Sequence, residues 1–183
     1  MRKKLSEFSL GDMTLIYEMH SSNGNVGMIL LPSSLKDLVT NEKKYRVDSI
    51  VQLKLLGDDY PDGFSQGITM RNSSSTRNLK YVSQRLIDEH DKKTIVTILE
   101  NNYNHELEHR VTWFQGDQSI MVYSIFKNSG NANTCIEMLS SFSLGGLTPF
   151  VKDDAANTLL VHQLRSKWSS EGRLQTSTVE DLL

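Results

Sequence analysis

The sequence predicts an all-β protein of antiparallel strands arranged in two stacked sheets. Its dominant hydrophobic period is two, the pattern of strands that bury one face. From residue 47 to 142, candidate strands and turns follow one another about every ten residues, and no long amphipathic helix separates them. A chain of 183 residues, 38% hydrophobic and 23% charged, has the composition of an ordinary globular protein with a sizeable core.

The first 77 residues should contain a hairpin, a strand and a long loop. Residues 13–19 and 25–31 flank a Ser-Ser-Asn-Gly turn and predict the hairpin, and residues 34–40 can form at most one helical turn. A strand is expected over residues 47–55, although Ile50 interrupts its polar face. Residues 58–77 are rich in Asp, Gly, Ser and Asn, which predicts a long loop with a binding or contact role and a flexible tip at residues 73–76.

Five further strands are expected downstream, at residues 79–88, 94–99, 105–114, 118–126 and 134–142. Residues 94–99 are nearly all β-branched or aliphatic, which is typical of a strand covered on both faces. In residues 105–114 the alternation places Trp113 on the apolar face, where packing between sheets is favoured over a role as a sugar platform. We expect residues 1–150 to form the sandwich and residues 151–183 to supply final strands or a connector.

Charge and composition exclude several classes of partner. Twenty basic and 22 acidic side chains give a net charge of −2 without a cationic block, which argues against nucleic-acid binding. No apolar run approaches the 18 or so residues of a membrane span and no signal peptide is evident, so a cytoplasmic protein is expected. Cys135 is the only cysteine, which excludes an internal disulfide and favours a simple packing role.

Residues 105–109, His-Glu-Leu-Glu-His, match the pattern of zinc peptidases. That chemistry requires a helix, on which the two histidines stand over one another. The β-branched and aromatic residues that follow predict a strand instead, and on a strand two side chains four residues apart are separated by about 13 Å. Because two ligands of one zinc ion each lie about 2 Å from it, we expect no metal site here.

Catalytic groups are not expected within the chain. A retaining glycosidase needs two carboxyl groups facing one another about 5 to 5.5 Å apart, whereas adjacent carboxylates diverge. Turn or surface roles therefore explain the neighbouring acids Asp58/Asp59, Asp88/Glu89, Asp153/Asp154 and Glu180/Asp181. The five histidines are scattered, and neither a nucleophile elbow nor a phosphate-binding loop is present.

The most informative residues lie near the C-terminus. Residues 165–173 combine Trp168 with three cations in a segment too polar for a core, a mixture that favours an interface anchor, with direct sugar contact as an alternative. Residues 140–150 read SSFSLGGLTPF, residues 161–173 read VHQLRSKWSSEGR, and residues 67–72 read GITMRN. In order and spacing, these segments resemble the N-terminal domain of bacterial alpha-galactosidases of glycoside hydrolase family 36.

The resemblance implies a large β-supersandwich of the galactose-mutarotase type, attached to a downstream catalytic barrel. It also implies a cofactor-free retaining hydrolase of terminal alpha-galactosides such as melibiose or raffinose, whose two catalytic aspartates lie on the barrel. In this sequence Lys167-Trp168 is followed by serine, not by the aspartate of the family's nucleophile motif, so no catalytic residue carries over. The last residues end inside an apolar-bearing run, and we expect the natural protein to continue.

The expected role of the chain is therefore non-catalytic: to support the barrel, to place loops near the substrate rim and to take part in a homo-oligomer. The residues expected at the rim or at the domain interface are Tyr60, Phe64, Arg71, Arg165, Trp168, Glu171 and Arg173. The alternative is a free-standing carbohydrate-binding or protein-interaction domain. A mutarotase-like enzyme is disfavoured because fold alone does not imply function and no matching His/Glu pair is found.

Overall fold

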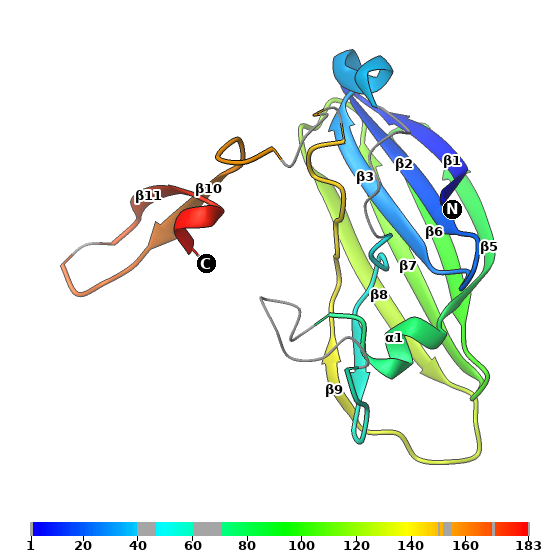
Figure 1. Cartoon of the computed structure of the whole chain (residues 1–183). Coiled ribbons are helices and arrows are strands. Elements are labelled where there is room, and N and C mark those ends of the chain that lie inside the picture. The colour runs from blue at the N-terminus through cyan, green and yellow to red at the C-terminus, as the bar shows by residue number, and fades with distance from the viewer. Residues whose placement is uncertain are drawn as a thin grey trace. The chain divides into compact units, whose positions relative to one another are not determined.

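The computed structural model describes residues 2–39, 47–60, 71–149, 151, 155–169 and 171–182. Its strands form four antiparallel sheets, which confirms the predicted all-β, sandwich-like fold (Figure 1). The chain divides into two compact units, and the main part of the second begins at Thr148. Each unit is described by itself.

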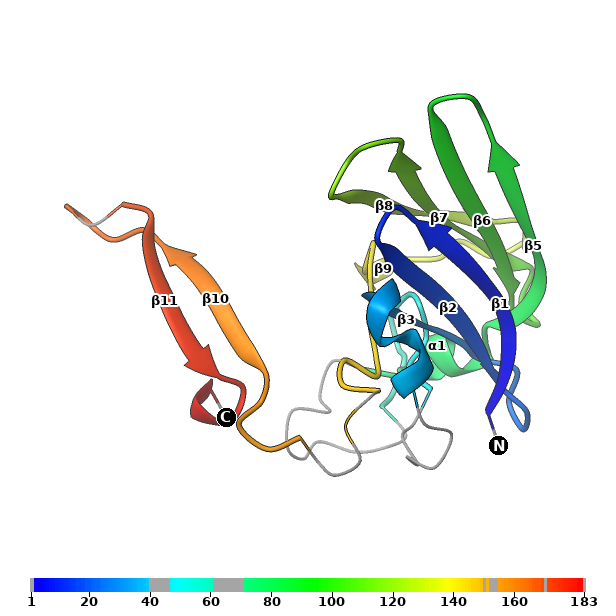
Figure 2. The same cartoon turned by 90° about the horizontal axis from the view of Figure 1, so that it is seen from above.

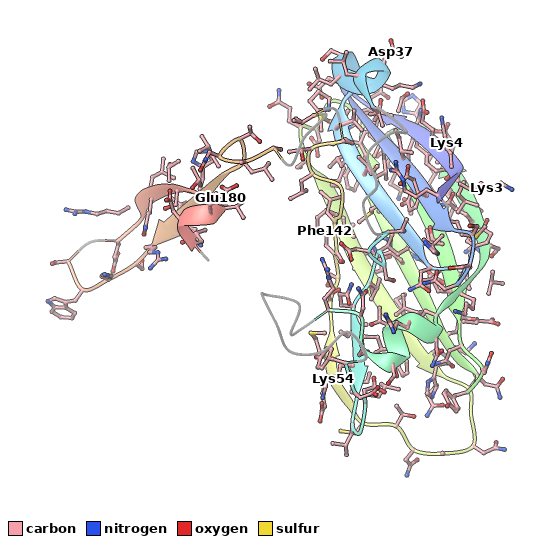
Figure 3. All side chains as sticks on the ribbon, in the orientation of Figure 1. Lys3, Lys4, Asp37, Lys54, Phe142 and Glu180 are labelled. Atoms are coloured by element: carbon pink, nitrogen blue, oxygen red, sulfur yellow. The ribbon has the colours of Figure 1, made fainter. Side chains whose placement is uncertain are left out.

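The first sheet is formed by β1 (Arg2–Leu10), β2 (Met13–His20) and β3 (Val26–Pro32), in the order β1-β2-β3. The predicted hairpin is confirmed, with Met19 paired to Val26 across the turn. A 3-10 helix, η1 (Ser33–Leu38), follows, and its six residues make about two turns where at most one was expected. Figure 3 shows Asp37 on it.

The second sheet is a four-stranded meander of β5 (Lys80–Asp88), β6 (Lys92–Glu100), β7 (His105–Phe114) and β8 (Ile120–Asn128). These four strands lie where the sequence predicts them. The side chains from Thr94 to Thr97 are buried, so β6 is covered on both faces as its β-branched run indicates.

The two sheets stack face to face, with the β1–β3 sheet lying across the β5–β8 sheet (Figure 2). Side chains from both sheets and from the segments between them meet in one core, formed by Leu10, Leu15, Tyr17, Val26, Met28, Ile50, Val51, Leu53, Leu55, Leu79, Ile95, Leu99, Leu107 and Val111. Trp113 packs at the margin of this core, which confirms its predicted packing role. Each large side chain buried here contributes about 1.5–3 kcal/mol, so this shared core holds the layers together.

The outer strands β1 and β5 each contain a bulge. The register with the neighbouring strand shifts between Lys4 and Ser6 in β1 and between Tyr81 and Ser83 in β5. The hydroxyl of Ser6 donates to Oε1 of Gln84, so these two strands lie next to one another at the same side of the sandwich.

The strand expected over residues 47–55 is much shorter. Only β4 (Leu53–Leu55) forms, paired with β9 (Ile136–Leu139), which is likewise shorter than predicted. The alternation fails because Ile50, expected on the polar face, is 0% exposed, and Gln52 is also buried. The backbone of Gln52 instead receives a hydrogen bond from Ser140 N–H (2.9 Å) and donates to the Ser140 hydroxyl (2.8 Å).

The prediction of a flexible loop tip at residues 73–76 is wrong. Helix α1 (Ser74–Asn78) begins there, with Ser73 as its N-cap, and Thr76 is completely buried. The Thr76 hydroxyl donates to the Leu53 carbonyl and accepts from the Leu53 N–H, both at 2.8 Å. These hydroxyl-rich residues are buried because the backbone of β4 satisfies their hydrogen bonds.

Asp58 holds the start of this helix from the other side. Its carboxylate accepts hydrogen bonds from the hydroxyls of Ser74 and Ser75 at 3.0 Å and from the Leu55 N–H at 2.8 Å. Partial burial acts to raise the pKa of Asp58, but these hydrogen bonds outweigh it and leave the pKa below its ordinary value. The predicted turn role of this carboxylate is confirmed.

The second unit contains the hairpin of β10 (Leu160–Arg165) and β11 (Arg173–Thr178), followed by the 3-10 turn η2 (Glu180–Leu182). Figure 3 shows Glu180 on this turn. Glu180 accepts a hydrogen bond from the Asn157 N–H at 3.0 Å, and Asp181 accepts one from the Thr178 N–H at 3.2 Å. Within the described ranges, the helices are too short or too polar to cross a membrane.

Candidate functional site

Four of the predicted site residues lie on the β10–β11 hairpin. Arg165 and Arg173 face each other as cross-strand partners next to the connecting loop, and Trp168 and Glu171 lie in that loop. All four side chains are exposed, and Trp168 is 98% exposed. The structure therefore brings these residues together on one small element.

One face of the hairpin exposes three leucines within its own unit, on either side of the hydrogen-bonded pair His162 and Thr176. Leu164 pairs with Leu174 across the strands, and Leu160 lies four residues from Leu164 on the same face. All three side chains are exposed, Leu164 to 75%. Among the described residues, β10 and β11 form hydrogen-bonded strand pairs only with each other. A two-stranded hairpin is marginally stable in water by itself, so this face is suited to contact with another surface.

The opposite face concentrates positive charge. Like charges directly across a strand pair destabilise it, yet Arg165 and Arg173 occupy such a pair. No acidic side chain in the described part of the chain pairs with either guanidinium; Arg165 donates to the Gln163 side chain at 2.9 and 3.2 Å. Two guanidinium groups without a carboxylate partner, on a hairpin that also exposes a tryptophan, are suited to bind carboxylates of a partner surface.

Tyr60 and Arg71, two of the remaining predicted residues, belong to the first unit. Nη1 of Arg71 lies 3.3 Å from Oδ2 of Asp48, an ion pair that ties the segment before α1 to the segment before β4. The ring of Tyr60 lies under the ammonium group of Lys54, with 5.9 Å between the nitrogen and the ring centroid. Phe64 lies outside the described residues. Tyr60 and Arg71 therefore have structural contacts of their own, and they belong to a different unit from the hairpin residues.

The two histidines of the His-Glu-Leu-Glu-His segment lie on β7, so the predicted strand is confirmed. Both are buried on the same face of the strand. The ring of His105 is within hydrogen-bond distance of the side chains of Asn101 (3.1 Å) and Thr134 (3.2 Å). No group of three or more metal-ligating side chains converges among the residues described.

His109, which the sequence marked only as part of the zinc-peptidase pattern, is a buried titratable group. It lies on one rung of the sheet between Thr97 and Ser124, and it is 0% exposed. Its ring nitrogens make no hydrogen bond of normal geometry with the described residues. Burial lowers the pKa of His109 to about 4, and a weaker polar contact with the Ser141 backbone offsets only part of this effect. The imidazole is therefore neutral at physiological pH.

Comparisons of the chain with family models, curated proteins and solved structures gave no match. The resemblance to glycoside hydrolase family 36 therefore rests on the motif residues alone.

Proposed function

We propose that the chain is a non-catalytic β-sandwich domain of an alpha-galactosidase of glycoside hydrolase family 36. In this proposal a catalytic barrel downstream in the same protein hydrolyses terminal alpha-galactosides of the melibiose or raffinose type. The observation that carries the proposal is the exposure of Arg165, Trp168 and Arg173 on a hairpin that carries the family-like motif. The motif side chains on this hairpin are exposed to solvent, which supports a role in contact with another domain.

The hairpin has the chemistry of a docking element. An aromatic side chain buries about 150–250 Å² at a contact, which at about 25 cal/mol per Å² corresponds to about 4–6 kcal/mol before the costs of association. Trp168 would supply that anchor, and the two arginines would pair with carboxylates of the barrel. Tyr60, Phe64 and Arg71 would contribute to the rim or to contacts between subunits of a homo-oligomer.

A protein-interaction domain without an attached enzyme is the second candidate, because the same three exposed leucines would suit an external partner. The gene sequence distinguishes the two candidates. The alpha-galactosidase proposal requires that the reading frame continue for several hundred codons and contain a Lys-Trp-Asp segment. A stop codon directly after Leu183 would contradict it.

The full-length gene product provides the functional test, with a nitrophenyl alpha-galactoside as substrate. The Trp168→Ala variant should lose most of its activity or its thermal stability, because the anchor to the barrel is gone. The matched control is Tyr103→Ala, which removes an aromatic side chain of the first unit that is 66% exposed and lies outside the family-like segments; it should leave both unchanged. Equal behaviour of the two variants would contradict the docking role, and turnover by residues 1–183 alone would contradict the non-catalytic role.

A further inference from the structure

A cleft of about 340 Å³ opens at one end of the sandwich, where the β1–β2 turn and the β7–β8 turn contribute to the same site. Its volume lies within the range of small-molecule sites, about 300–1,000 Å³. The cleft has an apolar part and a polar part. The apolar part is formed by Leu10, Met13, Leu30, Trp113 and Ile120, and the polar part by Asp12, Asp117, Gln118 and Ser119.

The indole of Trp113 is held in place by both turns. Its Nε1–H donates to the Asp117 carbonyl oxygen at 2.8 Å. Gly11 packs against the benzo edge, since a Cβ built on Gly11 would lie 3.2 Å from Cζ2 of the ring. Gly11 also has a φ of +64°, which favours glycine. The ring is thus a fixed apolar wall, and a ligand would not have to order it.

The polar part of the cleft retains its hydrogen-bonding capacity. The side chains of Asp12, Asp117, Gln118 and Ser119 make no hydrogen bond or ion pair with other described residues. Each is exposed and comes from one of the two turns that hold Trp113. Two carboxylates accept hydrogen bonds, and the amide and the hydroxyl can both donate and accept. A ligand with several hydroxyl groups can be matched by this set.

We propose that this cleft binds a hexopyranose, either free or as the terminal unit of an oligosaccharide. A pyranose ring has an apolar C–H face that can lie on a fixed indole and a hydroxyl edge that can donate to carboxylates. Two aspartates line the cleft and no cationic side chain does, so the cleft would repel an anionic ligand. The two carboxylates would also attract a cationic amine, but the cleft offers one aromatic wall rather than an aromatic cage, and choline tests this alternative. The proposal does not depend on the alpha-galactosidase assignment.

Fluorescence can isolate this site because the chain has only two tryptophans, Trp113 and Trp168. In the Trp168→Phe variant, emission reports Trp113 alone. Titration with galactose, glucose or melibiose should change the emission saturably, with a Kd on the order of 1 mM. Melibiose binding more tightly than both monosaccharides would identify an oligosaccharide end as the ligand, and equal affinity would identify a free hexose. Sorbitol, an open-chain polyol, should give no saturable change.

Variants of the two aspartates test whether these residues contribute to sugar binding. Asp12→Ala and Asp117→Ala should each weaken binding about tenfold or more, as expected for the loss of a hydrogen bond to a charged group. The control Asp37→Ala removes an exposed aspartate on η1 and should have no effect. Trp113 itself is left intact because it packs against the core. Saturation-transfer NMR provides a second readout of the same binding.

Three results would overturn the proposal. The first is the absence of saturable binding of any of the three sugars in both fluorescence and NMR. The second is an equal response to sorbitol or a stronger one to choline, which would indicate a polyol or cation site. The third is binding that neither aspartate variant weakens, which would place the sugar elsewhere on the chain.

Discussion

Removal of the His109 imidazole should flatten the acid dependence of stability. In the native protein this ring is buried and its pKa is about 4, whereas in the unfolded chain the pKa is the ordinary 6.5. Between these two values only the unfolded state binds the proton, so the free energy of unfolding falls as the pH decreases from 6.5 to 4. At about 1.4 kcal/mol per pH unit, the loss amounts to about 3 kcal/mol.

A loss of this size is measurable because the stability of a domain is typically about 5–15 kcal/mol. Urea unfolding of the wild type and of His109→Gln would be followed by circular dichroism at several pH values between 7.5 and 4. The titration of carboxylates contributes equally to both proteins, so it cancels in the difference between their free energies of unfolding. The wild type should lose about 3 kcal/mol relative to the variant over this range, with unchanged dependence on urea concentration.

His90→Gln is the control, since His90 is exposed in the turn between β5 and β6. This variant should retain the wild-type pH dependence. A difference curve between wild type and His109→Gln that is flat from pH 7.5 to 4 would refute the assignment of His109 as a buried neutral base.

Two further predictions concern the buried hydroxyl of Thr76 and the glycine beside Trp113. Thr76→Val should lower the free energy of unfolding by about 1–3 kcal/mol, because it leaves the buried Leu53 backbone without its hydrogen-bond partner. Thr76→Ser keeps the hydroxyl and should retain most of the stability. Urea unfolding measures the free energy of both variants. Gly11→Ala should destabilise more than Gly116→Ala and should alter tryptophan emission, because both residues have positive φ but only a Cβ at Gly11 meets the Trp113 ring. The cost of the φ alone is about 1–2 kcal/mol, so equal destabilisation of the two variants with unchanged emission would contradict the contact.

The sequence predicted well those strands whose buried residues follow a pattern visible within the strand itself. The β-branched run of β6 and the alternation of β7 each mark a strand without reference to the rest of the chain. The predictions failed where the partner is distant. Thr76 is buried because the backbone of Leu53 receives its hydroxyl, and Ile50 is buried by packing that strand alternation cannot anticipate.

The same distinction applies to the candidate sites. The residues around Trp168 share one sequence segment, so composition alone could mark them as a surface element. The cleft at Trp113 was not predicted, because Asp12 and Asp117 come from turns far apart in the sequence and meet only through the stacking of two sheets. Sequence pattern favoured packing of Trp113 over a role as a sugar platform, and it did not predict that the packed ring also lines a cavity.

The bulges of β1 and β5 bear on how copies of this protein could assemble. Outer strands expose unpaired backbone groups that invite edge-to-edge polymerisation, and bulges and lysines are common means of preventing it. Here both strands are bulged, and β1 also carries Lys3 and Lys4 (Figure 3). Continuous sheet extension across subunits is therefore blocked on this side of the sandwich, and self-association of the protein would have to proceed through other surfaces.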